Sequence, residues 1–275
     1  MKKLFLLIML FVPFVLQGQT WMEIPAQVPG GGPYVTTRTT LAGNEMRSFT
    51  YRYDSERKVA LWVAYPLNID LIGSGSRGEG WLPDPALPES VQPALYKGFR
   101  YGSGYDRGHQ IPSADRLDPK ANEQTFRFTN ATPQLHDFNG GLWAELEKHV
   151  RTWARRCDTL YVVTGIIPGN DWIEDNNGNP VNIPSAYYKA FLRRFQNRNK
   201  KVFWSGGAVL LQHKVYPVGN WNENADVFRQ NSLSLIELEA LTHETYFPLL
   251  ENVVGKEDYM KIKSEPMRDQ ELWWR

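Results

Sequence analysis

One segment of the chain carries a histidine, an arginine, two amides and a carboxylate at close spacing. Hydrolysis of a phosphodiester needs a base for the attacking water, positive charge near the phosphoryl oxygens and ligands for a hard cation. No other segment of the sequence offers a comparable set, so metal-assisted phosphodiester chemistry is the first hypothesis. The residues are Asp106, Arg107, Gly108 and His109, followed by Asn130, Asn139 and Glu147.

Each residue type suits one part of that chemistry. His109 is the natural base, because imidazole has a pKa of about 6.5 and accepts a proton near neutrality. Gly108 before it predicts a tight backbone. Arg107 can place its forked guanidinium on phosphate oxygens and keeps its charge. Asn139 and Glu147 offer oxygen atoms, which Mg²⁺ prefers, and Mg²⁺ needs few protein ligands because it keeps most of its waters.

A helix is expected to begin at Asn139. Glu147 follows eight residues later, roughly 80° around a helix of 3.6 residues per turn, so both side chains can border one face. Apolar residues that would fix this helix to the core recur at helical intervals, at Leu142, Trp143, Leu146 and Val150.

Structural explanations compete with these roles. A lone histidine beside a glycine is often an ordinary loop or core residue. For the other residues the alternatives are an N-cap for Asn139, a turn residue for Asn130, an ion pair with Arg151 for Glu147, and an ion pair with Asp106 or Asp115 for Arg107.

Strand-like runs surround the segment and predict an α+β fold, a mixed, mainly antiparallel central sheet flanked by helices. Residues 48–53 and 59–65 alternate around a turn and predict a hairpin. Gly and Pro dominate residues 68–100, which predicts a long ordered loop. A short extended stretch is expected at residues 107–112 and further strands at 160–167, 186–195 and 202–212. Residues 175–178 predict the turn of another hairpin, and residues 234–242 are expected to open the last helix.

The first residues are typical of a secretory signal. Lys2 and Lys3 precede an apolar run over residues 4–16, which is too short to span a bilayer comfortably. We expect cleavage after Gly18; an uncleaved anchor is the alternative. The expected organisation is a signal peptide at 1–18, an irregular lead-in rich in Gly and Pro at 19–45, and one domain at 46–275. The protein is therefore expected to be exported, periplasmic or extracellular, with no membrane contact after signal removal.

The charge balance limits how the protein could bind nucleic acid, and the cysteine content limits its disulfides. The 31 basic and 30 acidic residues become 29 and 30 without Lys2 and Lys3, a net charge of about −1. Any basic footprint for nucleic acid must therefore be local. Cys157 is the only cysteine, so no intramolecular disulfide can form, and its thiol is expected to be buried and inert.

Other hydrolase classes lack their motifs. Serine esterases need a G-x-S-x-G elbow and zinc hydrolases an H-E-x-x-H pair, and neither occurs. The remaining histidines are scattered and expected to be structural or on the surface: His136, His149, His213 and His243.

The motif resembles that of the DNA/RNA non-specific endonucleases of the ββα-metal (His-Me finger) class. The resemblance rests on Asp106 to His109 and continues through Asn130, Pro133-Gln134, Asn139, Trp143 and Leu146-Glu147. It extends to residues 81–85, 102–105, 163–165, 183–189 and 236–247, and covers roughly residues 48–250. One departure is Thr129, where the family commonly has Ser.

The resemblance implies a role for each matching residue. His109 would be the general base, Asn139 the direct Mg²⁺ ligand, Glu147 a holder of metal-bound waters, Asn130 an orienting residue and Arg107 a phosphate contact. Mn²⁺ is a possible substitute for Mg²⁺. DNA and RNA would be cut without sequence specificity, leaving 5′-phosphate and 3′-hydroxyl ends; a catalytically inactive nucleic-acid-binding relative is the alternative. Further candidate substrate contacts are Arg100, Arg116 and Lys148, beside the weaker candidates Lys97, Arg151 and Arg155.

Overall fold

The computed structural model describes residues 21–28, 34–41, 44–78, 80–96 and 104–274. The expected signal peptide at 1–18 and the candidate contacts Lys97 and Arg100 lie outside these residues. Within the described ranges, no helix is both long enough and apolar enough to cross a membrane.

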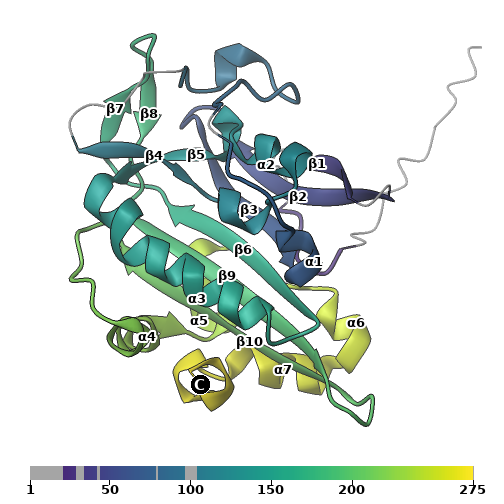
Figure 1. Cartoon of the computed structure of the whole chain (residues 1–275). Helices are drawn as coiled ribbons and strands as arrows, with labels where there is room; N and C mark the ends of the chain where they lie inside the picture. Colours follow the sequence, from purple (N-terminus) through teal and green to yellow (C-terminus); the bar gives the residue numbers. More distant parts are fainter. Residues whose placement is uncertain (1–20, 29–33, 42–43, 79, 97–103, 275) are drawn as a thin grey trace, which may run out of the picture.

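A seven-stranded antiparallel sheet forms the centre of the molecule, in the order β1-β2-β3-β6-β9-β10-β11 (Figure 1). The expected hairpin of residues 48–65 is its β2–β3 pair, and the α+β prediction is confirmed. The strands are β1 (Tyr34–Leu41), β2 (Asn44–Asp54), β3 (Val59–Leu67), β6 (Thr159–Ile167), β9 (Ala186–Gln196), β10 (Val202–Gln212) and β11 (Ser232–Leu233).

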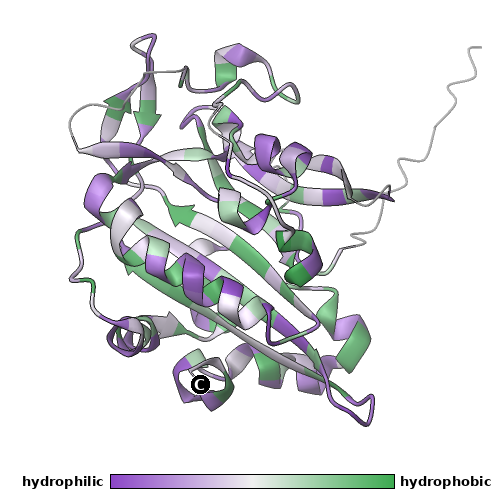
Figure 2. Cartoon of the chain, viewed as in Figure 1, coloured by the Kyte–Doolittle hydropathy of each residue, from purple (hydrophilic) through white to green (hydrophobic). Residues whose placement is uncertain are grey.

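Both faces of the sheet are covered, and this explains why its central strands have nearly continuous buried residues. Tyr187 and Phe191 of β9 pack into the core on one face, whereas Tyr188 and Leu192 pack into the core on the other. Figure 2 shows hydrophobic residues along the sheet strands beneath helix α3 (Ala144–Ala154). The other face is covered by α5 (Leu235–Thr242), α6 (Leu250–Val254) and α7 (Lys256–Ser264) (Figure 1).

A ββα unit, which ends in α3, packs on one face of the sheet. Its two strands, β4 (Tyr105–His109) and β5 (Ala131–Leu135), pair antiparallel. They are followed by a wide helical turn, η4 (Phe138–Trp143), and then by α3. The segment between the strands holds η2 (Ser113–Asp115), α2 (Pro119–Thr125) and η3 (Phe128–Asn130). Strands β4 and β5, running across the upper part of Figure 1, are thereby joined to the long diagonal helix α3.

The expectation of an irregular segment at 19–45 is wrong for its second half. Residues Tyr34–Leu41 form β1, the edge strand paired with β2. The Gly- and Pro-rich run ends at Pro33, and the β-branched residues after it favour a strand. The first half contributes Ile24 to the core and Glu23 to a buried ion pair with Arg47.

The C-terminal part is more helical than expected. Helix α5 is present but is not the last one, because α6 and α7 follow it. Helix α4 (Trp221–Gln230), also not foreseen, begins with a capping box between Asn220 and Glu223. The remaining short elements are α1 (Ile69–Ile72), η1 (Glu89–Val91), β7 (Trp172–Glu174), β8 (Pro180–Asn182), η5 (Met267–Asp269) and η6 (Glu271–Trp273).

Candidate active site

The β4–β5 hairpin holds His109 at the end of β4, opposite Ala131. A glycine is required at the preceding position. A Cβ atom on Gly108 would lie 2.1 Å from the side-chain oxygen of Gln134, a separation that real atoms do not adopt. The glycine expected to give a tight backbone therefore makes room for the Gln134 side chain of the neighbouring strand.

His109 is almost completely buried, with 9% of its surface exposed. Its ring lies against Trp81, at 4.6 Å between ring centres, and against Phe126, at 4.8 Å. Burial lowers the pKa of His109 to about 3, and the charges of Arg77 and Arg107 lower it further. The imidazole is therefore neutral at pH 7, and its buried Nε2 atom has no hydrogen-bond partner in the part of the chain described.

Asn130 fixes the loop that follows His109. Its Nδ2 atom donates to the carbonyls of Ile111 at 3.0 Å and Thr125 at 2.7 Å. Its Oδ1 atom accepts from the Ile111 N–H at 3.0 Å, and its backbone carbonyl accepts from the Gln110 N–H at 3.0 Å. The side chain is 1% exposed, so Asn130 positions the backbone around His109 and is more than a turn residue.

Asn139 is oriented by Asp106. The Nδ2 atom of Asn139 donates to Oδ2 of Asp106 at 3.0 Å, and the same oxygen lies 3.0 Å from Nδ1 of His136. An amide oxygen cannot take the place of Nδ2 here, because it would face another acceptor. The Oδ1 atom therefore points away from the Asp106 carboxylate.

The N-cap alternative for Asn139 is wrong. Asn139 lies inside η4, and the N-cap position of α3 belongs to Trp143. Gly141, with φ −97° and ψ −122°, breaks the helical geometry between η4 and α3. The angle of roughly 80° expected between Asn139 and Glu147 assumed one continuous helix, and that assumption does not hold.

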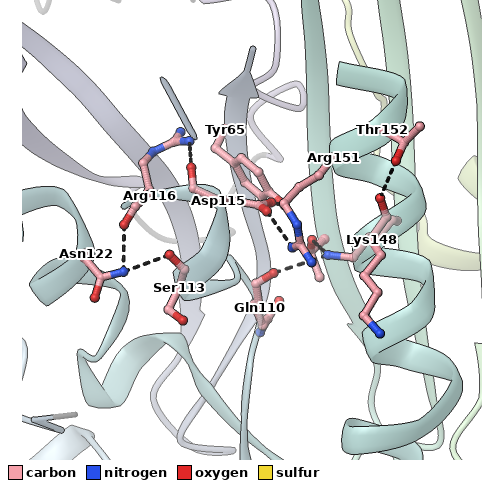
Figure 3. Close-up of polar contacts among 11 residues, drawn as sticks. Tyr65, Gln110, Ser113, Asp115, Arg116, Asn122, Lys148, Arg151 and Thr152 are labelled. Carbon is pink, nitrogen blue, oxygen red and sulfur yellow. Dashed lines mark hydrogen bonds and ion pairs between the residues drawn. The ribbon is translucent and has the colours of Figure 1, made fainter. Parts of the chain in front are cut away.

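Glu147 projects from the first turn of α3 and is partly exposed. The surrounding protein nevertheless raises its pKa to about 7 by desolvation; the charge of Lys189 opposes this rise, and that of Asp115 adds to it. The alternative of an ion pair with Arg151 is not what the structure contains. Arg151 bonds to Asp115 instead, with 3.0 Å between Nη1 and Oδ1 (Figure 3).

The oxygen atoms available at this site fit a hydrated hard cation. The described ranges contain no group of three or more His, Cys, Asp or Glu side chains that could hold a metal ion. The oxygen ligands expected from the sequence are Asn139 Oδ1 and the Glu147 carboxylate. This small set suits Mg²⁺, which keeps most of its waters, and not zinc, which needs three or four nitrogen or sulfur ligands.

Arg107 extends toward the segment that precedes β4. Its Nη1 atom donates to the carbonyl of Leu95 at 3.1 Å and to that of Tyr96 at 3.3 Å. Its guanidinium carbon is 5.4 Å from the centre of the Trp81 ring, which also contacts His109. The guanidinium and the imidazole therefore contact the same indole ring, and the charge of Arg107 lowers the pKa of His109.

Arg77 is a candidate site residue that sequence reasoning missed. It is exposed, and its charge lowers the pKa of both His109 and Glu147. Its guanidinium carbon is 5.8 Å from the centre of the Phe126 ring, against which His109 packs. The only signal in the sequence is a lone arginine within a Gly-rich loop, which does not distinguish it from a surface residue.

The predicted substrate contact at Arg116 is wrong. This side chain is 1% exposed, and its guanidinium donates to the carbonyls of Asp115 at 2.8 Å, Ser48 at 2.7 Å and Pro66 at 2.8 Å. Figure 3 shows Arg116 on the opposite side of Asp115 from Arg151. Arg116 joins the loop after His109 to the sheet, and a buried guanidinium cannot reach a polymer outside.

Lys148 remains accessible, whereas the other expected contact cannot be placed. The Lys148 side chain is 56% exposed, and its Nζ atom bonds to Glu145 at 2.5 Å. It lies on α3 directly after Glu147. Arg100 lies outside the described residues.

Two other histidines are structural, as expected. His149 is buried, with its ring stacked on Trp221 at 3.5 Å between centres. The Nε2 atom of His213 accepts from the Leu135 N–H at 2.8 Å.

Cys157 is half-buried, and burial raises the pKa of its thiol to about 12, so the thiol stays protonated.

Sequence comparisons point to one group of enzymes. The family model described as DNA/RNA non-specific endonuclease matches residues 32–252. A nuclease of Nostoc sp. is 36% identical over 143 residues, which cover 49% of this chain and 51% of that protein. A nuclease of Serratia marcescens is 36% identical over 147 residues, which cover 52% of this chain and 55% of that protein. The chain thus spans about half the length of these two curated relatives.

More distant relatives align over more of their length. Mitochondrial endonuclease G of Bos taurus is 26% identical over 255 residues, covering 86% of this chain and 80% of that protein. The crystal structure of the EndoG/EndoGI complex matches with a TM-score of 0.53 at 22% identity, over 72% of this chain and 82% of that chain, and supports the fold. Because the family model spans most of the sequence, the chain belongs to the DNA/RNA non-specific endonuclease family.

Proposed function

We propose that this protein is an exported, Mg²⁺-dependent endonuclease that hydrolyses phosphodiester bonds of DNA and RNA. One observation carries the proposal: Asn139 donates to Asp106, which lies on the same strand β4 as His109, and this hydrogen bond leaves the amide oxygen of Asn139 free of that carboxylate. Family membership and the nuclease relatives support the same reaction class.

Each side chain of the proposed site has its own role in the hydrolysis. His109 is neutral at pH 7 and takes the proton from the attacking water. Asn139 would hold Mg²⁺ directly and Glu147 through water. When bound, the ion supplies positive charge to the phosphoryl oxygens and the leaving group. Arg107 and Arg77 add fixed positive charge beside the imidazole, and the products carry 5′-phosphate and 3′-hydroxyl ends.

The proposed substrate is the sugar-phosphate backbone of either nucleic acid. Arg107, Arg77 and Lys148 are suited to phosphate contacts, which position a strand without reading its sequence. A chain with a net charge of about −1 after signal removal depends on these local charges. We therefore propose cleavage without sequence specificity, and Mn²⁺ as a substitute for Mg²⁺.

Export is proposed from the sequence of residues 1–18, with the periplasm or the medium as destination. Lys2, Lys3 and the apolar run after them support it.

The test is to incubate the purified mature protein with supercoiled plasmid and with RNA, first with Mg²⁺ and then with EDTA. We expect both substrates to be degraded with Mg²⁺ and to stay intact with EDTA. The variant His109→Ala should be inactive with an unchanged circular dichroism spectrum. His243→Asn, at an exposed position, is the matched control and should keep full activity. Folded protein that cuts neither substrate with any divalent metal would refute the proposal.

A further inference from the structure

A cavity of about 290 Å³ lies beside the loop that Arg107 contacts. One water in liquid occupies about 30 Å³, so this cavity has room for roughly ten non-hydrogen atoms, about the size of one nucleobase. Its walls come from the loop of residues 89–96, the turn between β7 and β8, Lys58 and Phe128. The function proposed above does not use this space.

Hydrogen bonds hold the walls of the cavity in place. The Nζ atom of Lys58, in the turn between β2 and β3, donates to the carbonyl of Ser90 at 2.7 Å. On the other side of the same loop, the Asp175 carboxylate accepts from the Ala94 N–H at 2.9 Å. The loop is therefore fastened both to the β2–β3 turn and to the β7–β8 turn, and the cavity is formed before any ligand arrives.

Tyr96 gives the cavity an aromatic surface that solvent can reach. It lines the cavity and is 42% exposed. Its ring meets that of Phe128 at 85°, with 5.3 Å between the ring centres, so Phe128 covers at most one of its two faces. The Tyr96 hydroxyl donates to the Glu89 carboxylate at 3.1 Å, which fixes the outer end of the ring.

A series of contacts joins the cavity to the candidate active site. The Nη1 atom of Arg107 donates to the carbonyl of Tyr96 at 3.3 Å. The Arg107 guanidinium carbon also lies 5.4 Å from the centre of the Trp81 ring, which is 4.6 Å from the centre of the His109 ring. Successive nucleotides of a helical strand are spaced about 3.4 Å along its axis. A strand with one phosphate on Arg107 therefore has a neighbouring nucleotide within reach of the cavity.

The groups in the cavity suit a neutral base better than a phosphate. A phosphate would meet the Glu89 carboxylate, whereas the Lys58 ammonium is already engaged by backbone carbonyls. A base has a flat π-face that can stack on the Tyr96 ring. Asn177, exposed in the β7–β8 turn, carries an amide that can both donate to and accept from the edge of a base.

We propose that this cavity binds one nucleobase of the substrate strand, stacked on Tyr96, next to a phosphate held by Arg107. This inference rests on the proposed function, because it takes nucleic acid as the substrate. Stacking on an aromatic ring accepts every base, so the cavity adds affinity without sequence specificity. In a duplex the bases are already stacked and paired, and the cavity therefore favours single strands and unpaired segments.

The first test measures nucleic-acid binding without cleavage. A fluorescein-labelled single-stranded DNA octamer is titrated with the mature protein in EDTA and followed by fluorescence anisotropy. We expect Tyr96→Ala to weaken binding by at least about fivefold, as loss of a ring that stacks on a base commonly does. Tyr96→Phe keeps the ring and loses only the hydrogen bond to Glu89, so it should bind like the unmodified protein.

Phe203→Ala is the matched control. Phe203 of β10 is exposed to the same extent as Tyr96, 42%, and packs beside Phe195, with 6.3 Å between the ring centres. It does not line the cavity. Its loss should leave the affinity for the octamer unchanged. Equal affinities in Tyr96→Ala and in the unmodified protein, or no binding of the octamer by the unmodified protein, would overturn the proposal.

Octamers with one abasic position show whether the Tyr96 ring meets a base. In the unmodified protein, removal of the base at one position should weaken binding, and in Tyr96→Ala this loss should disappear because the stacking partner is gone. Equal losses in both proteins at every position would refute the stacking, even where Tyr96→Ala is less stable.

The plasmid assay separates this inference from the proposed function. Metal-dependent cleavage by the unmodified protein together with binding that does not depend on Tyr96 would refute only the base-binding cavity. Binding that depends on Tyr96, from a protein that cuts no nucleic acid, would support the cavity and refute only the nuclease function.

Discussion

The Nδ2 atom of Asn139 lies 3.0 Å from Oδ2 of Asp106, and this hydrogen bond joins the first strand of the ββα unit to the turn before α3. Asp106 belongs to the same short motif as His109. One end of the motif therefore supplies the proposed base, and the other end orients the proposed metal ligand.

Replacing Asp106 should impair metal use more than folding. In Asp106→Ala the Asn139 amide loses the acceptor that fixes its orientation, so we expect the Mg²⁺ concentration for half-maximal cleavage to rise about tenfold. His136→Ala removes the other partner of the same oxygen and serves as the control, with a much smaller effect. An unchanged Mg²⁺ requirement in Asp106→Ala would contradict the orienting role.

Asn139→Ala removes the proposed ligand itself. Activity should fall chiefly through weaker metal binding and should be partly rescued by high Mg²⁺. Cleavage rates measured over a Mg²⁺ series test this, and a loss of activity that is the same at every Mg²⁺ concentration would argue against direct ligation.

The buried His109 should make the fold sensitive to acid. Its pKa is about 3 in the folded protein and about 6.5 in the unfolded chain. As the pH falls through this window, the unfolded chain binds a proton and the folded protein does not, so stability declines by at most about 1.4 kcal/mol per pH unit. The contribution is fully present above pH 6.5 and lost toward pH 3.

Urea unfolding of the unmodified protein and of His109→Ala at several pH values from 7 to 4 isolates this contribution. The difference between the two free energies of unfolding should change steadily across the window, in the direction that favours the variant at low pH. Parallel curves for the two proteins would show that His109 does not titrate as described.

Gly108→Ala should destabilise the β4–β5 hairpin, because the added methyl group would lie 2.1 Å from the Gln134 side-chain oxygen. Overpacking of this kind costs about 1–3 kcal/mol. The double variant Gly108→Ala with Gln134→Ala removes the obstructing side chain and should be more stable than Gly108→Ala. Thermal denaturation of the single and double variants provides the comparison, and a double variant no better than the single one would point to a cause other than this clash.

Arg77→Ala should lower the turnover number by at least about tenfold while changing the melting temperature little, because the side chain is exposed and its charge acts beside a developing negative charge. Arg198→Ala, at the exposed β9–β10 turn, is the matched control. Steady-state kinetics on a short oligonucleotide measure the effect; equal turnover in both variants would exclude Arg77 from the site.

Much of the candidate site could be predicted from residues close together in the sequence. Asp106, His109 and Asn139 lie within one segment, so their residue types suggested metal-assisted hydrolysis, and the resemblance to a nuclease family then implied roles for His109 and Asn139. Most strands of the large sheet could also be predicted, because they are runs of apolar and β-branched residues; these strands are β2, β3, β6, β9 and β10. Helices α4 and α7 were missed because most of their residues are polar, and α6 because it is short.

Other features depend on contacts between distant parts of the chain. Arg116 lies beside the motif in the sequence, yet its guanidinium is buried against Ser48 and Pro66. Arg77 is remote from the motif in the sequence and comes close to it only in the folded protein. Because burial decides whether a basic side chain can meet a phosphate, sequence position alone cannot assign such contacts.

The residues of the proposed site are synthesised before one of the central strands of the sheet. His109, Asn139 and Glu147 all precede β9, which supplies Tyr187 and Phe191 to the core that also contains residues of α3. A nascent chain that ends before Ala186 contains the proposed base and both proposed metal ligands without the strand that holds them. We therefore expect the proposed nuclease activity to arise only after the second half of the sheet has been synthesised.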